Sequence, residues 1–416
     1  MTFSMAADHS RGKFAQDKIF GASAAANKAA AQFGKDKVTN ATIGALLDDS
    51  EKLVCLSVVE KVFRSLPTTE IINYAPIAGL PEYLDAVIGE ACADNKPEAY
   101  IKAIATSGGS GVIHHTIWNY SGMSDTVLTS DWYWGPYKVL ADGLGRKLDT
   151  FTLFNEQQNF NIKSFETKTR ELLAKQDSVV ILLNTPAHNP TGYSLTDNEW
   201  DQVISVLKDC AKDQSKRVIL MADIAYIDYA GEKNTSRAFI RKFSGLPKNI
   251  LAILAYSMSK GYTVYGQRTG AMIGISASQD VITEFENINQ YTSRATWSNI
   301  NRGCMRMLAT IYNDQALRAE IEQERAKYYR LIQDRAAIFT KEAEQANLHM
   351  LPFRAGFFLS IPVKNSDAVC DKLHDDNIFA VPLAKGVRVA VCAVPTTKIV
   401  GMASKIKKAI EIVDQI

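Results

Sequence analysis

Three apolar segments, each followed by polar residues, constrain the fold of this chain most strongly. They cover residues 178–184, 217–222 and 251–256 and are rich in Val, Ile and Leu. Runs of this length and content are typical of β-strands that are buried on both faces. Helical stretches separate the strand candidates from about residue 100 to 276, which indicates a mostly parallel sheet with helices on both sides. Ligands bind at the carboxyl ends of such strands, so the polar residues after each run are candidate site residues.

Lys260 and Arg268 follow the third apolar segment. A lysine amine can form a Schiff base with an aldehyde, and the planar fork of an arginine suits a phosphate. A single lysine is most often a solvated surface charge, so the position just past a buried strand is what favours a functional role. The cofactor that carries both an aldehyde and a phosphate is pyridoxal 5′-phosphate.

The other two segments end in residues that suit the same cofactor. Asp223 follows the second segment, and a buried carboxylate there can keep a pyridine nitrogen protonated. Asn189 and Tyr226 offer an amide and a hydroxyl that can bind the phenolic oxygen of the ring. Taken singly, Asp223 could be a helix cap and residues 189–192 a simple turn. Their shared position after apolar strands favours one common site.

These motifs resemble those of the class I aminotransferases, specifically the aspartate and aromatic aminotransferase subgroup. The similarity rests on residues 187–192, residues 223–226, and residues 257–260 with Arg268, and further matches extend from Gly44 to Arg388. The resemblance implies that Lys260 is the Schiff-base lysine and proton shuttle, that Asp223 pairs with the pyridine nitrogen, that Asn189 and Tyr226 bind the ring hydroxyl with Tyr226 also catalytic, and that Ser257 and Arg268 hold the phosphate.

The resemblance extends to the rest of the cofactor pocket. Residues 108–111 form a Gly-rich turn before a helical stretch, where backbone N–H groups can bind a phosphate. By resemblance, Gly109 and Ser110 are phosphate ligands and Trp134 stacks on the cofactor ring. Tyr74 resembles a tyrosine that binds the phosphate of a neighbouring subunit. The expected assembly is therefore a homodimer with shared active sites.

Three residues are implied in substrate binding. Arg388 lies in an alternating apolar run and resembles the arginine that pairs with the substrate α-carboxylate. Arg294 aligns with an arginine that binds a side-chain carboxylate across the dimer, and Gly44 is the third position. Asn184 and Tyr137 stand where aspartate aminotransferases usually carry histidines.

The implied fold is α/β of pyridoxal-phosphate fold type I: a large domain with a mostly parallel seven-stranded sheet between helices, and a smaller α+β domain. We expect an N-terminal arm and part of the small domain over residues 1–50, the large cofactor-binding domain over 51–320, and a connecting helix with the small C-terminal domain over 321–416. The connecting helix is predicted over about 314–348, where Ile321, Tyr328, Ile332 and Phe339 form one stripe.

Composition excludes several classes of function. The net charge is +2 over 416 residues, so nucleic-acid and membrane partners are not expected. No apolar run is long enough for a membrane span, and no secretory signal is visible. Six cysteines without paired spacing predict reduced thiols and a cytoplasmic location. No metal site is expected.

The predicted function is the transfer of an amino group from an L-α-amino acid, either aspartate or an aromatic one, to 2-oxoglutarate. The substrates are thus amino acids and 2-oxo acids. A lyase, decarboxylase or racemase using the same lysine chemistry is the alternative. A non-enzymatic regulator that carries the cofactor is a remote one, because such proteins have a basic helix-turn-helix domain for which the residues before Gly44 leave no room.

Overall fold

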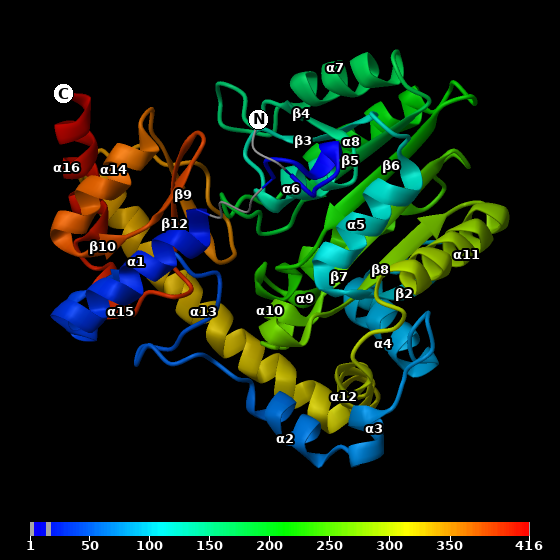
Figure 1. The fold of residues 1–416 in the computed structure, drawn as a ribbon, viewed down its shortest axis with the longest axis horizontal. Helices are drawn as coiled ribbons and strands as arrows, with labels where there is room; N and C mark the ends of the chain where they lie inside the picture. The colour runs from blue at the N-terminus through cyan, green and yellow to red at the C-terminus, as the bar shows by residue number, and fades with distance from the viewer. Residues whose placement is uncertain (1–3, 14–17, 416) are drawn as a thin grey trace.

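A seven-stranded sheet forms the centre of the larger part of the molecule (Figure 1). The computed structural model describes residues 4–13 and 18–415. The strands of this sheet are β2 (Tyr100–Ser107), β3 (Thr126–Ser130), β4 (Lys147–Phe151), β5 (Ser178–Asn184), β6 (Arg217–Asp223), β7 (Ile250–Ser257) and β8 (Thr269–Ser276). Their order across the sheet is β2-β8-β7-β6-β5-β3-β4. Only β8 runs antiparallel to its neighbours, so the predicted mostly parallel, seven-stranded sheet is confirmed.

Both faces of this sheet are buried, which explains why its central strands are continuously apolar. Successive side chains of a strand point to opposite faces. In β5, Val180 and Leu182 pack in one apolar core with Ile113 and Ile117 of helix α5. The alternate residues Val179, Ile181 and Leu183 pack in a second core on the other face.

The described residues include twelve helices that lie in this larger part or, in the case of the last one, connect it to the rest of the molecule. They are α2 (Ser57–Ser65), α3 (Thr68–Ile72), α4 (Pro81–Cys92), α5 (Gly108–Tyr120), α6 (Pro136–Gly143), α7 (Ile162–Leu173), α8 (Asp197–Cys210), α9 (Lys233–Arg237), α10 (Met258–Gly261), α11 (Gln279–Thr296), α12 (Arg302–Asn313) and α13 (Gln315–Gln345). Helix α5 packs on β2, β7 and β8, and α7 packs on β4 and β5. The sheet is therefore covered on both sides.

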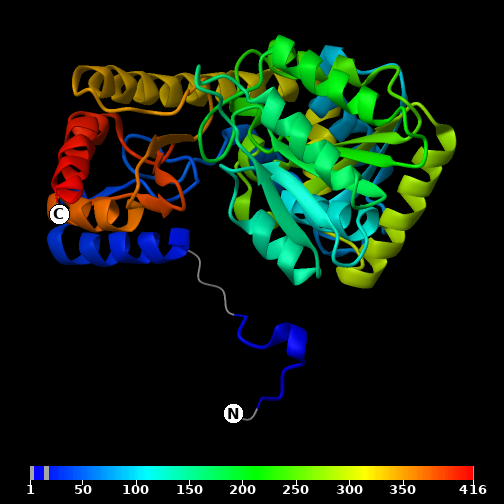
Figure 2. The same ribbon diagram turned by 90° about the horizontal axis from the view of Figure 1, so that it is seen from above.

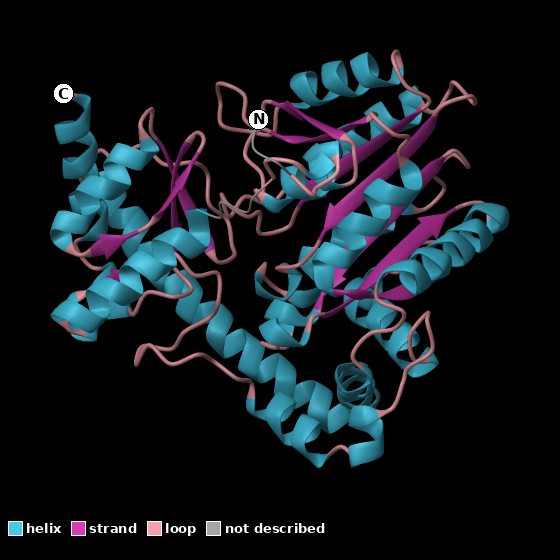
Figure 3. Ribbon diagram, viewed as in Figure 1, coloured by secondary structure: helices cyan, strands magenta, loops and turns pink. Residues whose placement is uncertain are grey.

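A smaller group of elements combines segments from early and late in the chain (Figures 1 and 3). Its elements are α1 (Lys18–Phe33), β1 (Thr39–Asn40), β9 (Phe358–Pro362), α14 (Ser366–Leu373), β10 (Ile378–Phe379), β11 (Val381–Leu383), β12 (Gly386–Ala390), α15 (Thr396–Ile399) and α16 (Met402–Asp414). Strand β1 pairs with β10, and β11, β12 and β9 form an antiparallel sheet. The N-terminal residues thus pair with residues more than 300 positions later.

The 31-residue helix α13 joins the two groups and runs along one side of the molecule in Figure 2. It contacts α2 and α12 near its start and α15 and α16 near its end. The Asp314 carboxylate caps its first turn, accepting hydrogen bonds from the N–H groups of Ala316 and Leu317 at 2.8 and 3.0 Å. The predicted helix is present, and Ile321, Ile332 and Phe339 of its predicted stripe are buried. The domain boundaries at residues 50 and 320 remain predictions.

Candidate active site

A cavity of about 170 Å³ lies where the carboxyl ends of β5, β6 and β7 meet the start of α5. Strand β2, which leads into α5, points in the same direction as β7 because both run antiparallel to β8. The lining residues come from segments far apart in the sequence. They are Gly109, Ser110, Ile113, Trp134, Asn184, Asn189, Asp223, Ala225, Tyr226, Ser257, Ser259, Lys260 and Arg268. Nine of the predicted site residues are among them.

The start of α5 and the Arg268 side chain form the basic end of the cavity. Gly108 has φ +62°, and a Cβ there would lie 2.8 Å from Nη2 of Arg268. Glycine adopts this backbone conformation without strain and leaves room for the guanidinium. Nη1 of Arg268 donates to the Tyr265 carbonyl at 2.9 Å and to Oγ of Ser259 at 3.2 Å. A helix N-terminus beside a guanidinium is suited to a phosphate.

Lys260 lies in helix α10, which directly follows β7, and its side chain lines the cavity. Desolvation is the largest cause that lowers the pKa of this amine, Asp223 opposes it and the charge of Arg268 adds to it, and together they lower the pKa to about 8. Nζ lies 5.3 Å from the centre of the Tyr226 ring. The amine can therefore lose its proton near neutral pH, as a nucleophile or a base must.

Asp223 is the last residue of β6 and is buried. Its Oδ2 accepts a hydrogen bond from the Tyr137 hydroxyl at 2.6 Å, and its Oδ1 accepts one from the Ala225 N–H at 3.1 Å. Burial raises the pKa of this carboxyl, and the hydrogen bonds from Tyr137 and Ala225 oppose that shift. Tyr137 of α6 thus supports Asp223 where aspartate aminotransferases usually have a histidine.

Asn184 and Asn189 organise the opposite side of the cavity. The Asn184 amide donates to the backbone oxygen of Asp223 at 3.0 Å and accepts from the Asn189 N–H at 2.5 Å. The Asn189 amide donates to the Tyr226 hydroxyl at 3.3 Å, and its oxygen accepts from Nη1 of Arg388 at 3.3 Å. Continuous hydrogen bonds therefore link Arg388 of the smaller sheet to Tyr226.

Arg388 and Gly44 lie beside this cavity but do not line it. Arg388 is 2% exposed, which leaves its guanidinium enclosed by protein. Nη2 donates to the Thr42 carbonyl at 2.8 Å, and the guanidinium lies 4.3 Å from the centre of the Phe358 ring. A Cβ at Gly44 would approach the same ring to 2.9 Å. The two predicted substrate residues therefore meet at Phe358.

Two predicted residues, Tyr74 and Arg294, do not lie in the cavity of this chain. Tyr74 is 84% exposed, and Arg294 is exposed at the end of α11. Conversely, Ile113, Asn184, Ala225 and Ser259 line the cavity and were not among the predicted site residues. Ser259 was within reach of sequence reasoning because it lies between Ser257 and Lys260 in the motif. Ile113 and Ala225 look like ordinary core residues in the sequence.

The lining residues fit pyridoxal 5′-phosphate in chemistry. The cavity offers a basic end for a phosphate, an amine for an aldehyde and a buried carboxylate for a pyridine nitrogen. The hydroxyl and amide groups of Tyr226 and Asn189 are hydrogen-bonded to each other and can bind a phenolic oxygen. Among residues 4–13 and 18–415, no cluster of three or more His, Cys, Asp or Glu side chains could hold a metal ion.

Comparison with known proteins identifies the family. Residues 36–406 match the family model for aminotransferase class I and II. The aromatic-amino-acid aminotransferase of Escherichia coli is 26% identical over 342 residues, covering 78% of this chain and 81% of that protein. The mitochondrial aspartate aminotransferase of Gallus gallus is 23% identical over 376 residues, covering 87% and 85%. The crystal structure of an aminotransferase from Anaerococcus prevotii is 36% identical, with a TM-score of 0.96 and coverage of 98% and 100%.

The sheet topology and the similarity to the solved aminotransferase structure place this protein in the α/β class of fold type I. The chain belongs to the class I and II aminotransferase family and is a pyridoxal-phosphate-dependent aminotransferase. The predicted family, fold and cofactor are therefore confirmed. No helix among the described residues combines the length and the apolar character that crossing a membrane requires.

Proposed function

We propose that this enzyme moves the amino group of an L-α-amino acid, aspartate or an aromatic one, to 2-oxoglutarate, using a covalent bond between pyridoxal 5′-phosphate and Lys260. The observation that carries the proposal is the presence in one cavity of a Lys260 amine with a pKa of about 8 and the buried Asp223 carboxylate. Bound pyridoxal phosphate supplies an electron-withdrawing ring that acidifies the substrate Cα–H.

The residues of the chain have distinct tasks in this proposal. Arg268, Ser257 and the first N–H groups of α5 at Gly109 and Ser110 hold the phosphate. Asp223 keeps a proton on the pyridine nitrogen, Asn189 and Tyr226 bind the ring hydroxyl, and Trp134 stacks on the ring. Nζ of Lys260 takes the proton from the substrate Cα. Each task matches the chemistry of the side chain assigned to it.

The test compares wild-type protein with Lys260→Ala. Wild-type protein should form glutamate from 2-oxoglutarate and an amino acid, and borohydride should fix pyridoxal phosphate to the peptide that contains Lys260. Lys260→Ala should lose at least about 10³-fold in kcat and should not be labelled, while Lys248→Ala, a control on a lysine outside the cavity, should behave as wild type. Release of CO₂ without glutamate formation would overturn the proposal in favour of a decarboxylase.

Substrate choice is proposed to depend on Arg388 and Arg294. Arg388 holds the α-carboxylate of every substrate, and Arg294 of the second subunit holds the side-chain carboxylate of aspartate or glutamate. Arg294→Leu should reduce kcat/KM for aspartate by about 10²-fold or more, because a lost charge partner discriminates by several kcal/mol. The loss for phenylalanine or tyrosine should be much smaller. Equal losses for both classes of substrate would show that Arg294 does not bind the side chain of the substrate.

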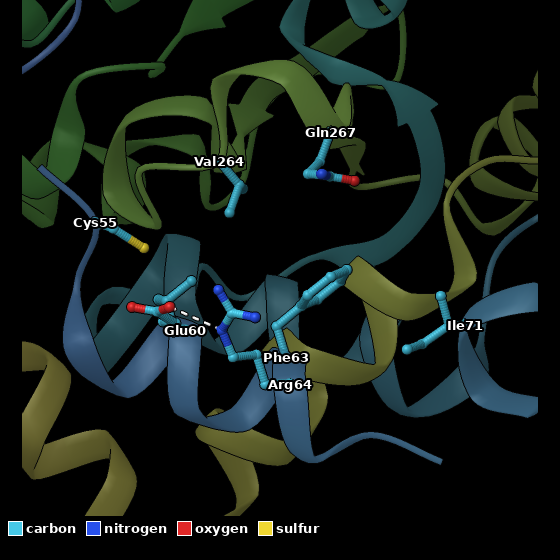
Figure 4. A pocket seen from close by; sticks show the side chains of 8 residues that line it. Cys55, Glu60, Phe63, Arg64, Ile71, Val264 and Gln267 are labelled. Atoms are coloured by element: carbon cyan, nitrogen blue, oxygen red, sulfur yellow. Dashed lines mark hydrogen bonds and ion pairs between the residues drawn. The ribbon is translucent and has the colours of Figure 1, made fainter. Parts of the chain in front are cut away.

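We further propose a homodimer with shared active sites, working in the cytoplasm. A groove of about 580 Å³ lies between α2 and the loop that leads to Arg268 (Figure 4). Figure 4 shows Val264 and Gln267 on one side facing Phe63 and Arg64 on the other. Ile72 and Tyr74 near the end of α3 are 75% and 84% exposed. Apolar exposure of this kind marks a surface that a partner covers, and a second copy would place its Tyr74 close to this basic loop.

The state of the cysteines supports the proposed cytoplasmic location. None of the six cysteines, all among the described residues, is in a disulfide, as expected in a reducing compartment.

A further inference from the structure

A buried ionic cluster lies directly behind the loop that carries Lys260. It consists of Glu90, Asp228, Arg237 and Arg325, whose side chains are at most 6% exposed. The four residues come from α4, from the segment after β6, from α9 and from α13. Buried charges require close partners because desolvation is costly. Removal of any one partner would therefore disturb the others.

Within this cluster, Arg325 hydrogen-bonds to the backbone next to Lys260. Its Nε donates to the backbone oxygen of Gly261, the residue after Lys260, at 2.8 Å. Its Nη1 donates to Glu90 and to Glu322, each at 3.0 Å. Its guanidinium lies 4.6 Å from the centre of the Tyr262 ring. One side chain of the long helix α13 thus holds the residues on the C-terminal side of Lys260.

Asp228 connects the same cluster to the loop that follows β6. A Cβ at Gly261 would lie 1.9 Å from Oδ2 of Asp228, so the carboxylate packs directly on this glycine. Asp228 pairs with Arg237 at 2.6 Å and lies 3.9 Å from Arg325. The segment that follows Asp223 and contains Tyr226 and Asp228 is therefore packed against the segment that contains Lys260 and Gly261.

We propose that Arg325 is a positioning residue for the Lys260 amine. This inference rests on the proposed function, because it assigns Arg325 a role in the reaction of that lysine. A lysine stem is flexible, so the accuracy of its amine depends on how firmly its backbone is held. Arginine can donate to Gly261, Glu90 and Glu322 together because its planar fork has five N–H groups. A lysine at position 325 keeps the charge but cannot make these contacts at once.

The role of Arg325 is geometric and not electrostatic. Desolvation, Asp223 and Arg268 are the largest causes of the lowered pKa of the Lys260 amine, whereas Arg325 contacts the backbone of the next residue. Arg325→Lys, which keeps the charge, should therefore still impair the reaction. A purely electrostatic role would leave Arg325→Lys close to wild type.

The test uses Arg325→Lys with Arg330→Lys as a matched control. Arg330 lies five residues further along α13, at the mouth of the same charged pocket, and is exposed. Arg325→Lys should lower kcat and the rate constant for covalent binding of pyridoxal phosphate to the apoprotein by about 10- to 100-fold. KM should change less than about threefold. Arg330→Lys should match wild type in all three quantities.

A second variant keeps the proposal testable if Arg325→Lys does not fold. Glu90→Gln removes the charge opposite Arg325 but leaves the hydrogen bond to Gly261 possible, so it should slow covalent binding by a smaller factor. Wild-type rate constants in the folded Arg325→Lys variant, or in Glu90→Gln alone if the former does not fold, would overturn the inference, even if thermal stability falls. An inactive, unlabelled wild-type protein would instead overturn the proposed function.

Discussion

At the scale of single residues, the Tyr137–Asp223 hydrogen bond determines how the buried carboxylate of this site is supported. Burial raises the pKa of the Tyr137 hydroxyl well above its ordinary value, so this group remains a neutral donor at every pH at which the enzyme would work. A histidine at this place would itself titrate near neutral pH. Tyr137 therefore stabilises ionised Asp223 without adding a titrating group of its own.

Replacement of Tyr137 by Phe should shift the pH dependence of the reaction. The variant fills the same space but loses the donor, so the raised pKa of Asp223 should rise further, because a hydrogen bond that stabilises the ionised carboxylate is lost. Asp223 must be ionised to hold a proton on the pyridine nitrogen. Activity is lost as pH falls through the Asp223 pKa, so the acidic limb of the kcat/KM profile should move to higher pH. An unchanged limb in Tyr137→Phe would show that another group sets it.

At the scale of elements, the sequence predicted those strands and helices whose formation depends on local hydrophobic patterning. Strands β5, β6 and β7 were visible because burial on both faces leaves continuous apolar runs. Helix α13 was visible because its apolar residues form one stripe. The antiparallel direction of β8 was not predicted, because direction depends on pairing with β2 and β7 and not on the composition of the strand.

The same limit applies to the candidate site. Residues that directly follow strands, such as Asp223 and Lys260, were predicted because strand ends converge at one edge of the sheet. The contact of Tyr137 with Asp223 spans 86 positions, and that of Arg325 with Gly261 spans 64. Neither leaves a periodic signal in the sequence. Tyr137 was singled out only through the resemblance to a family, and the role of Arg325 became apparent only once the fold had placed it beside Gly261.

At the scale of the whole molecule, one chain leaves two of its predicted site residues exposed on its surface and not in its own cavity. Tyr74 and Arg294 are exposed, whereas Lys260 and Arg268 line the cavity. A twofold dimer repeats the same contact in both directions, so each chain can complete the site of the other. In the proposed homodimer, each active site combines Lys260 of one chain with Tyr74 of the second.

Mixing two inactive variants tests this arrangement. Lys260→Ala removes the reactive amine, and Tyr74→Asp places a carboxylate against the phosphate of the second chain, so each homodimer should be inactive. A heterodimer has one site with both changes and one site with neither. Random reassortment makes half of the dimers mixed, so the mixture should recover about one quarter of wild-type activity. The measurement is glutamate formation after dissociation and reassociation of the mixed variants. If Tyr74 acted within its own chain, every site would carry one of the two changes, and mixing would restore nothing.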